Sequence, residues 1–321
     1  MNALYKYLLV AGIVKLPDVK LSVFKTLKTR ALHRQPDFGY VFCWFLLPSE
    51  EDRTLLFVDS ENNELKRVDL QSESVVDVIY RCNSPAKMVA ALFVEFAPQQ
   101  EALLVAERLP DAAANSMSHS LSVALRDASR WTRRQRVPLE TATCELKYTY
   151  PVSIGTVHTN KVLCGVWETS ALEALAVDAT GTARRLQPVR LGFAHLCFAT
   201  GRSQDTELLV ISLASFTEVR LLQVANGESL SVRLLRVIFV RNCNRLLWRA
   251  GLLFAASWDA QTETDEVSVW HVSGDGRHVE RRGTPIARAD NLRIQCWSAV
   301  RERFALFDVK SEEVLVYELK N

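Results

Sequence analysis

The sequence predicts an all-β fold built from one short unit that is repeated along the chain. The first observation is residues 54–70, TLLFVDSENNELKRVDL, in which an apolar strand is followed by a tight polar turn at Asp59–Asn63 and a second strand that ends at Leu70. Residues 304–319, FALFDVKSEEVLVYEL, repeat this pattern, and in both copies an Asp ends the first strand and a Leu ends the second eleven residues later (Asp59 to Leu70, Asp308 to Leu319). Looser versions recur between the two copies, which favours a repeat architecture over two unrelated domains.

Composition is consistent with a large packed core. Hydrophobic residues make up 48% of the 321 residues, which excludes disorder of the whole chain. The 39 basic and 37 acidic residues nearly cancel, leaving a net charge of +2. Net charge therefore gives no argument for a polyanionic partner, although a local basic patch is compatible with it.

Cysteine usage indicates a reduced, intracellular protein, cytoplasmic or nuclear. The seven cysteines are odd in number and at least 20 residues apart, so none has the spacing of a zinc finger or a CxxC motif. Several lie inside apolar runs, where we expect them to act as small buried apolar residues. The apolar run Tyr7–Val14 is too short to span a membrane and no cleavage site follows it, so we expect neither export nor a membrane.

The chain in order begins with residues 1–19, an extension that is ambiguous between helix and strand, followed by a strand within residues 20–30. Residues 40–47 form a strongly apolar strand that Pro48 ends, and the repeated units follow. Their second strands are centred on leucines separated by 48, 59, 46, 44 and 53 residues: Leu56, Leu104, Leu163, Leu209, Leu253 and Leu306. Most units continue with a turn, a third strand and an arginine-bearing fourth strand, such as residues 131–139 or 230–238.

Four short strands recurring at this interval are typical of a β-propeller blade. We therefore expect one domain, residues 1–321, with six blades at about 40–81, 88–139, 143–190, 191–238, 244–283 and 290–319. Seven blades would result if residues 1–47 contained a further degenerate unit. The last unit lacks a fourth strand, and the strand at residues 20–30 is unassigned, so we predict that this N-terminal strand completes the last blade. That pairing closes the ring and leaves no exposed seam.

At the level of period and strand pattern the chain resembles the WD40-like β-propeller superfamily. Ser268-Val269-Trp270-His271 is similar to the end of a WD repeat, with His271 where an Asp is expected, and no Gly-His dipeptide opens the blades. The resemblance implies a rigid platform whose loops hold partners. No functional residue of the family is carried over to this chain.

Catalytic motifs are missing from the sequence. There is no GxSxG, no Gly-rich phosphate loop and no HExxH, and we expect no cofactor and no metal. His195 and Cys197 are two residues apart and would face the same side of a strand, as two soft metal ligands do. Because no second pair accompanies them, we favour a structural pair in a core strand.

An acidic channel mouth is one candidate site. Trp258 and Asp259 end an apolar strand, and Glu107, Glu168 and Asp308 end the corresponding strands of other units. Their convergence would form an acidic ring near the central channel, suited to a cation or a basic peptide. The alternative is that turns simply favour polar residues at strand ends.

Basic outer strands are the other candidate. Arg130, Trp131, Arg133 and Arg134 form one such stretch, and similar arginines recur in later units. Positive charge on a sheet edge prevents edge-to-edge aggregation. The functional interpretation is a basic rim for nucleic acid or an acidic protein, with Trp131 stacking on a base.

These observations predict a non-enzymatic protein–protein interaction scaffold or adaptor subunit of an intracellular complex, with other proteins as partners. The candidate partner-binding residues are Trp258, Asp259, Arg130, Trp131, Arg133 and Arg134. One alternative is a nucleic-acid-associated propeller that uses a basic rim. The other is a metal-dependent propeller hydrolase with carboxylates in the central channel.

Overall fold

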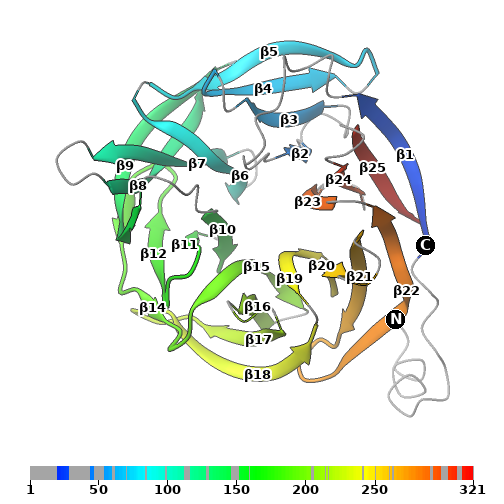
Figure 1. The fold of residues 1–321 in the computed structure, drawn as a ribbon. Helices are drawn as coiled ribbons and strands as arrows, with labels where there is room; N and C mark the ends of the chain where they lie inside the picture. Colours follow the sequence, from blue (N-terminus) through cyan, green and yellow to red (C-terminus); the bar gives the residue numbers. More distant parts are fainter. Residues whose placement is uncertain are drawn as a thin grey trace.

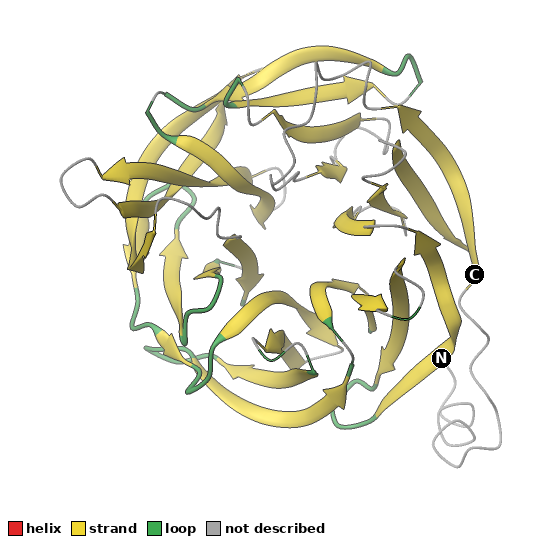
Figure 2. Cartoon of the chain, viewed as in Figure 1, coloured by secondary structure: helices red, strands yellow, loops and turns green. Residues whose placement is uncertain are grey.

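The structure of the chain is a computed structural model. It describes residues 20–28, 44–46, 54–59, 62–69, 71–83, 85–97, 100–111, 116–127, 130–145, 152–158, 160–203, 206–213, 215, 217–240, 242–249, 251–259, 261, 264–289, 292–297, 303–308 and 313–320. Within these ranges the secondary structure is strands joined by turns, and the strands surround a central axis (Figures 1 and 2). Within the same ranges there is no helix that is long and apolar enough to cross a membrane.

The described strands form six sheets, which we number in chain order. Sheet 1 contains β2 (Trp44–Leu46), β3 (Thr54–Asp59), β4 (Glu64–Asp69) and β5 (Ser74–Arg81). Sheet 2 contains β6 (Lys87–Ala97), β7 (Gln100–Asp111), β8 (Ser116–Asp127) and β9 (Arg130–Glu145). Sheet 3 contains β10 (Val152–Val157), β11 (Lys161–Val166), β12 (Ala171–Val177), β13 (Ala183–Arg185) and β14 (Val189–Arg190).

Sheet 4 contains β15 (His195–Ser203), β16 (Thr206–Leu213), β17 (Glu218–Ala225) and β18 (Ser231–Phe239). Sheet 5 contains β19 (Cys243–Arg249), β20 (Leu252–Asp259), β21 (Thr264–Val272) and β22 (Val279–Ala289). Sheet 6 contains β23 (Leu292–Trp297), β24 (Arg303–Asp308), β25 (Glu313–Lys320) and β1 (Lys20–Lys28). The first strand of each sheet lies nearest the axis and the last lies on the outside of the ring (Figure 1).

The predicted closure of the ring is confirmed. β1 pairs antiparallel with β25, from Lys20 opposite Lys320 to Lys28 opposite Glu313, with one bulge between Val23 and Lys25. The N-terminal strand thus becomes the outer strand of sheet 6, and the last sheet is completed by the first strand of the chain. The all-β propeller expected from the repeat pattern is the observed fold.

The core lies between neighbouring sheets. Leu104 and Leu121 of sheet 2 pack against Val162 and Leu175 of sheet 3, and all four side chains are fully buried. Similar clusters join sheet 3 to sheet 4 and sheet 4 to sheet 5. Each buried leucine contributes about 1.5–3 kcal/mol. Successive side chains of a strand point to opposite faces of its sheet. One face therefore packs on the preceding sheet and the other on the following sheet.

The hairpin of β7 and β8 is longer than the neighbouring ones. Its ladder continues through small and polar residues, where Pro110 pairs with Met117 and Asp111 pairs with Ser116. Residues 112–115 lie outside the described ranges.

Candidate functional site

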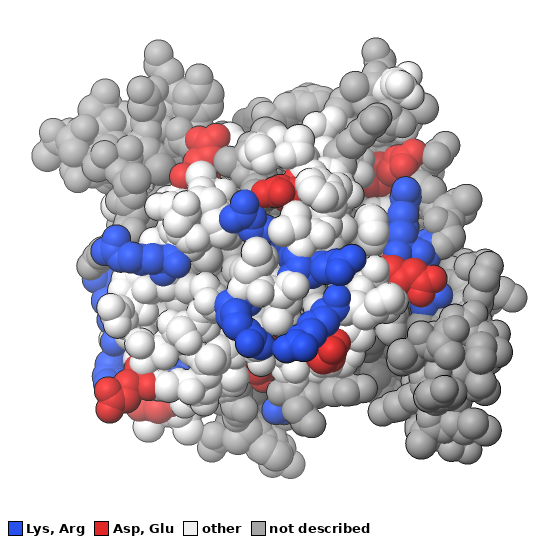
Figure 3. Space-filling model, turned by 90° about the horizontal axis from the view of Figure 1, so that it is seen from below, with Lys and Arg blue, Asp and Glu red and all other residues white. Residues whose placement is uncertain are grey.

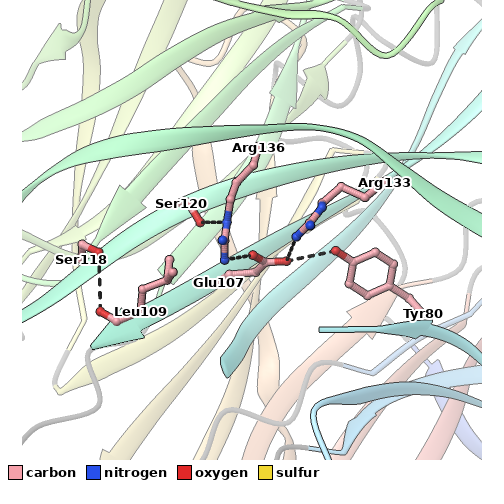
Figure 4. Close-up of polar contacts among 7 residues, drawn as sticks. All are labelled: Tyr80, Glu107, Leu109, Ser118, Ser120, Arg133 and Arg136. Atoms are coloured by element: carbon pink, nitrogen blue, oxygen red, sulfur yellow. Dashed lines mark hydrogen bonds and ion pairs between the residues drawn. The ribbon is translucent and has the colours of Figure 1, made fainter. Parts of the chain in front are cut away.

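Glu107 is the centre of a buried ionic cluster between sheets 1 and 2 (Figure 4). Its side chain on β7 has no exposed surface. It accepts a hydrogen bond of 3.0 Å from the Tyr80 hydroxyl of β5 and pairs with the Arg136 guanidinium of β9. Arg133 Nη1 lies 4.0 Å from Glu107 Oε1, and Arg136 Nε donates to Ser120 Oγ at 3.0 Å. The carboxylate is thus compensated from three directions, as a buried charge requires.

The cluster suppresses the acidity of its neighbours. Burial, and then the adjacent Glu107 charge, raise the pKa of Tyr80 well above its ordinary value. The same two causes raise the pKa of the Cys82 thiol to about 12. Both groups therefore remain protonated near neutral pH, and neither is an activated nucleophile. The arrangement stabilises the interface between sheets 1 and 2.

This geometry corrects one part of the predicted acidic mouth. Glu107 ends the inner part of β7 in sequence, but its partners Tyr80, Arg133 and Arg136 all belong to outer strands. The carboxylate is therefore directed away from the channel and cannot belong to a ring around it. The reason is the arginines of β9, whose charge stabilises Glu107 on that side.

The turn after β11 presents a second arrangement, at the edge of the innermost strand β15. Glu168 has a left-handed backbone with φ of 63°, and its amide donates to the carbonyl of His195 at 2.7 Å. The His195 amide in turn donates to the Thr169 carbonyl at 3.2 Å. These reciprocal bonds fix the turn against the first residue of β15, and the Glu168 side chain is exposed. Non-glycine residues held in this conformation cluster at functional sites.

The side chain of His195 also contacts that turn. Its Nδ1 lies 2.6 Å from the Thr169 carbonyl oxygen. Because a carbonyl can only accept, Nδ1 carries the proton and Nε2 does not. Nε2 is buried and has no hydrogen-bond partner among the described residues. Burial lowers the pKa of His195, so the imidazole is neutral near pH 7.

Gly165 explains why Nε2 is enclosed. A Cβ atom at this position would lie 2.6 Å from His195 Nε2 and 2.5 Å from Leu172 Cδ2. The bare backbone of β11 therefore packs directly on the imidazole ring, and this contact leaves no room for a ligand between them. His195 is a positioning residue of the Glu168 turn.

The predicted alignment of His195 and Cys197 on one face is wrong. A bulge lies between them, because His195 pairs with Leu213 and Cys197 with the next residue, Ser212. The extra residue turns the two side chains apart, and His195 contacts sheet 3 while Cys197 lies beside Arg245 of sheet 5. The expected burial of reduced cysteines is confirmed for Cys82, Cys164, Cys197 and Cys243, the free cysteines among the described side chains.

The other predicted site residues lie on two separate sheets. Arg130, Trp131, Arg133 and Arg134 are on the outer strand β9 of sheet 2, whereas Trp258 and Asp259 end the second strand β20 of sheet 5. These strands lie on opposite sides of the ring, so the six residues do not form one site (Figure 1). Side chains of Arg130, Trp258 and Asp259 lie outside the described part of the structure. Asp308 is the last residue of β24, and its side chain is likewise outside it.

The described outer-strand arginines are spread over several sheets. They lie on β9, β13, β14, β18 and β22, and some of their charge is used internally, as in the Arg136–Glu107 pair. A single basic rim face does not follow from this distribution. Among the described residues, no group of three or more His, Cys, Asp or Glu could hold a metal ion.

No protein-family model and no curated protein matches the chain. Several solved structures, however, match most of the chain. A PQQ-bound aldose sugar dehydrogenase from Streptomyces coelicolor is 10% identical, with a TM-score of 0.58 over 96% of this chain and 100% of its own. A functionally unknown protein from Desulfotomaculum acetoxidans is 12% identical, with a TM-score of 0.53 over 95% of both chains. A luciferin-regenerating enzyme is 10% identical, with a TM-score of 0.50 over 92% of this chain and 95% of its own.

These matches establish a propeller fold without singling out the WD40-like group. They also overturn the expectation of a non-enzymatic scaffold or adaptor, because that expectation rested on the fold and two of these three solved structures are enzymes. The sequence lacked a recognisable catalytic motif, but a propeller builds its sites from residues that are far apart in the chain. In the sequence, Glu168 is recognisable only as an acidic residue that follows a strand. The contacts of His195 with the Glu168 turn could not be predicted from the sequence.

Proposed function

We propose that the protein is an enzyme of the hydrolase type, whose substrate binds at the ring face where the second strands end. Glu168 is the carboxylate that we assign to the chemistry. The observation that carries this assignment is the pair of backbone hydrogen bonds that joins the Glu168–Thr169 turn to His195, because it fixes the turn that bears the exposed Glu168 side chain beside the innermost strand β15.

Further acidic positions support the same face. Asp59, Asp259 and Asp308 are the last residues of β3, β20 and β24, the second strands of sheets 1, 5 and 6. Second strands of a propeller run in the same direction through the ring, so their ends share one face with the Glu168 turn. Carboxylates gathered at such a mouth can take a proton from water or from a substrate hydroxyl group.

The role of the chain's own residues follows from these positions. Thr169 and His195 hold the turn, Glu168 has a left-handed backbone, and its side chain is exposed. A fixed base of this kind contributes about 10²–10⁴-fold to a proton-transfer step. If the same carboxylates bound a divalent cation, the reaction would depend on metal. The side chains that the structure describes include no group of three or more His, Cys, Asp or Glu that could hold one.

Similarity of the whole fold to a solved enzyme supports the proposal. The aldose sugar dehydrogenase matches over its entire length, so the fold of this chain is one that an enzyme uses. The closer resemblance to WD40-like repeats stays a prediction that depends on Ser268–His271. An intracellular location is likewise proposed from the free cysteines alone.

The test is a substrate screen with the purified protein. Aryl esters, γ- and δ-lactones and aryl phosphates are offered with Mn²⁺, with Ca²⁺ and with EDTA. Saturable turnover of at least one class, lost on heat denaturation, supports the proposal, and the EDTA arm decides whether metal takes part. Absence of turnover in every arm from protein whose unfolding is cooperative counts against it.

A further inference from the structure

β18 is the outer strand of sheet 4, and among the strands that the structure describes it pairs with β17 alone. It pairs with β17 from Glu218 opposite Phe239 to Ala225 opposite Ser231, and the sheet order ends there. An edge strand leaves alternate backbone N–H and C=O groups unpaired along its outer side, and these groups form a template for an additional strand. Proteins that recognise extended peptides bind them in this way.

Apart from its two arginines, β18 has no residue of the kinds that protect an edge. Its nine residues, SVRLLRVIF, contain no Pro, no Gly and no acidic residue. By contrast, β9 contains Pro138, and sheet 3 ends in the short strands β13 and β14, of three and two residues. Short strands and proline are ordinary means of blocking an edge.

Two large apolar side chains on β18 face solvent. Leu234 is 51% exposed and Phe239 is 79% exposed, whereas Leu235 and Ile238 of the same strand pack on the core between sheets 4 and 5. Arginine alone would be explained by protection of the edge. Exposed Leu and Phe side chains weaken that protection and instead favour contact with a partner.

β18 carries a positive charge, because it contains two arginines and no acidic residue. Arg233 and Arg236 are exposed, and Arg233 donates to the neutral Gln223 at 2.6 Å. The carboxylate opposite the end of the strand, Glu218, is paired with Arg220. In the view onto this side of the ring, basic side chains gather at the centre, with few acidic ones among them (Figure 3).

We propose that an extended acidic segment of a partner protein adds to β18 as a fifth strand of sheet 4. Backbone hydrogen bonds would join the two strands, Arg233 and Arg236 would pair with its carboxylates, and its apolar residues would cover Leu234 and Phe239. This surface lies on the outside of the ring, so it is independent of the reaction proposed for the channel face.

The test uses the full chain and a fluorescein-labelled nonapeptide of alternating Glu and Val. We expect saturable binding at low salt and slower amide hydrogen exchange confined to residues 231–239. The double variant Arg233→Glu/Arg236→Glu is expected to weaken binding by about tenfold or more, and Leu234→Ser/Phe239→Ser by several-fold. The matched control Arg184→Glu/Arg190→Glu reverses two exposed charges on β13 and β14 and is expected to change affinity less than about twofold.

Two further probes separate strand addition from attraction of charge. The same peptide with N-methylated alternate amides keeps its charge but loses the backbone bonds, and we expect about tenfold weaker binding. Equal affinity of the methylated peptide, equal binding to all variants, or no saturable binding would each overturn the proposal. Binding of a uridine 12-mer that requires Arg233 and Arg236, with no binding of the peptide, would overturn it in favour of a nucleic-acid surface.

Discussion

Gly165 and His195 show how one missing side chain positions another. The imidazole is accommodated only because the β11 backbone at Gly165 carries no Cβ, which would lie 2.6 Å from Nε2. Nδ1 is thereby held at the Thr169 carbonyl, and the Glu168 turn depends on this contact.

Gly165→Ala is therefore expected to lower the free energy of unfolding by about 1–3 kcal/mol through overpacking. Chemical denaturation of the wild type, Gly165→Ala, His195→Ala and the double variant measures this cost in a double-mutant cycle. In the His195→Ala background the added methyl group should cost much less, because the imidazole is gone. Equal costs in both backgrounds would show that the two residues do not interact.

His119 makes stability depend on pH. It is 1% exposed, and neither ring nitrogen has a hydrogen-bond partner among the described residues. Burial, and then the charge of Arg108, lower its pKa from 6.5 to about 4. The unfolded chain thus binds a proton between pH 6.5 and 4 that the folded chain does not, so stability falls as pH falls through this window.

We expect the melting temperature of the wild type to decrease between pH 7.5 and pH 4.5, and His119→Leu to remove part of that decrease. Scanning calorimetry at both pH values gives the comparison. Some dependence will persist in the variant because burial also lowers the pKa of His195 and of His271. An identical decrease in wild type and variant would contradict the assignment to His119.

At the scale of elements, the Glu107 cluster joins β5 of one sheet to β7 and β9 of the next. Tyr80 and Arg136 both contact the same buried carboxylate. Glu107 and Tyr80 are buried, whereas Arg136 is partly exposed. Loss of Glu107 leaves the buried Tyr80 hydroxyl without its partner, and loss of the Tyr80 hydroxyl removes one hydrogen bond from the buried carboxylate, which costs more than the net value of the pair.

Glu107→Ala is expected to destabilise the fold by about 2–4 kcal/mol, and Tyr80→Phe by roughly 1–2 kcal/mol. Denaturant unfolding of both single variants and the double variant tests whether these costs are coupled. Asp77→Asn is the control, because it breaks the half-exposed pair with Arg67 and should cost about 1 kcal/mol or less. Additive effects of Glu107→Ala and Tyr80→Phe would contradict a shared cluster.

Sequence reasoning located elements better than it oriented side chains. The hairpin at residues 54–70 and its copy at 304–319 became β3–β4 and β24–β25, because alternating apolar residues encode strands locally. The direction of Glu107 depended on arginines nearly thirty residues away, and the separation of His195 from Cys197 depended on a bulge. The Glu168 site also needed a contact between two sheets, which no local pattern encodes.

At the scale of the whole molecule, closure of the ring depends on one antiparallel ladder. β1 and β25 pair along eight residues. The prediction from sequence succeeded here because the last unit lacked a strand and the first segment supplied one. Without β1, the outer side of β25 would be an exposed edge.

Deletion of residues 1–28 is expected to cost roughly 3–6 kcal/mol from the lost ladder. The melting temperature should fall by on the order of 10 °C. The matched deletion of residues 1–19 keeps β1 and should change little. Circular dichroism melts and light scattering compare the two, and similar melting temperatures would show that the seam does not limit stability.

The central claim is that this propeller catalyses a reaction at the face that carries Glu168. It is tested most directly by incubating a metabolite extract with the wild type, with Glu168→Gln and with Glu228→Gln, and following all masses over time. Glu228 is the matched control because it is an exposed glutamate in the turn between β17 and β18, at the opposite face of the ring.

We expect wild type and Glu228→Gln to convert the same metabolite at the same rate, and Glu168→Gln to be slower by about 100-fold or more. All three proteins should melt at the same temperature. Equal conversion by Glu168→Gln, or no conversion by any of the three, would contradict the account.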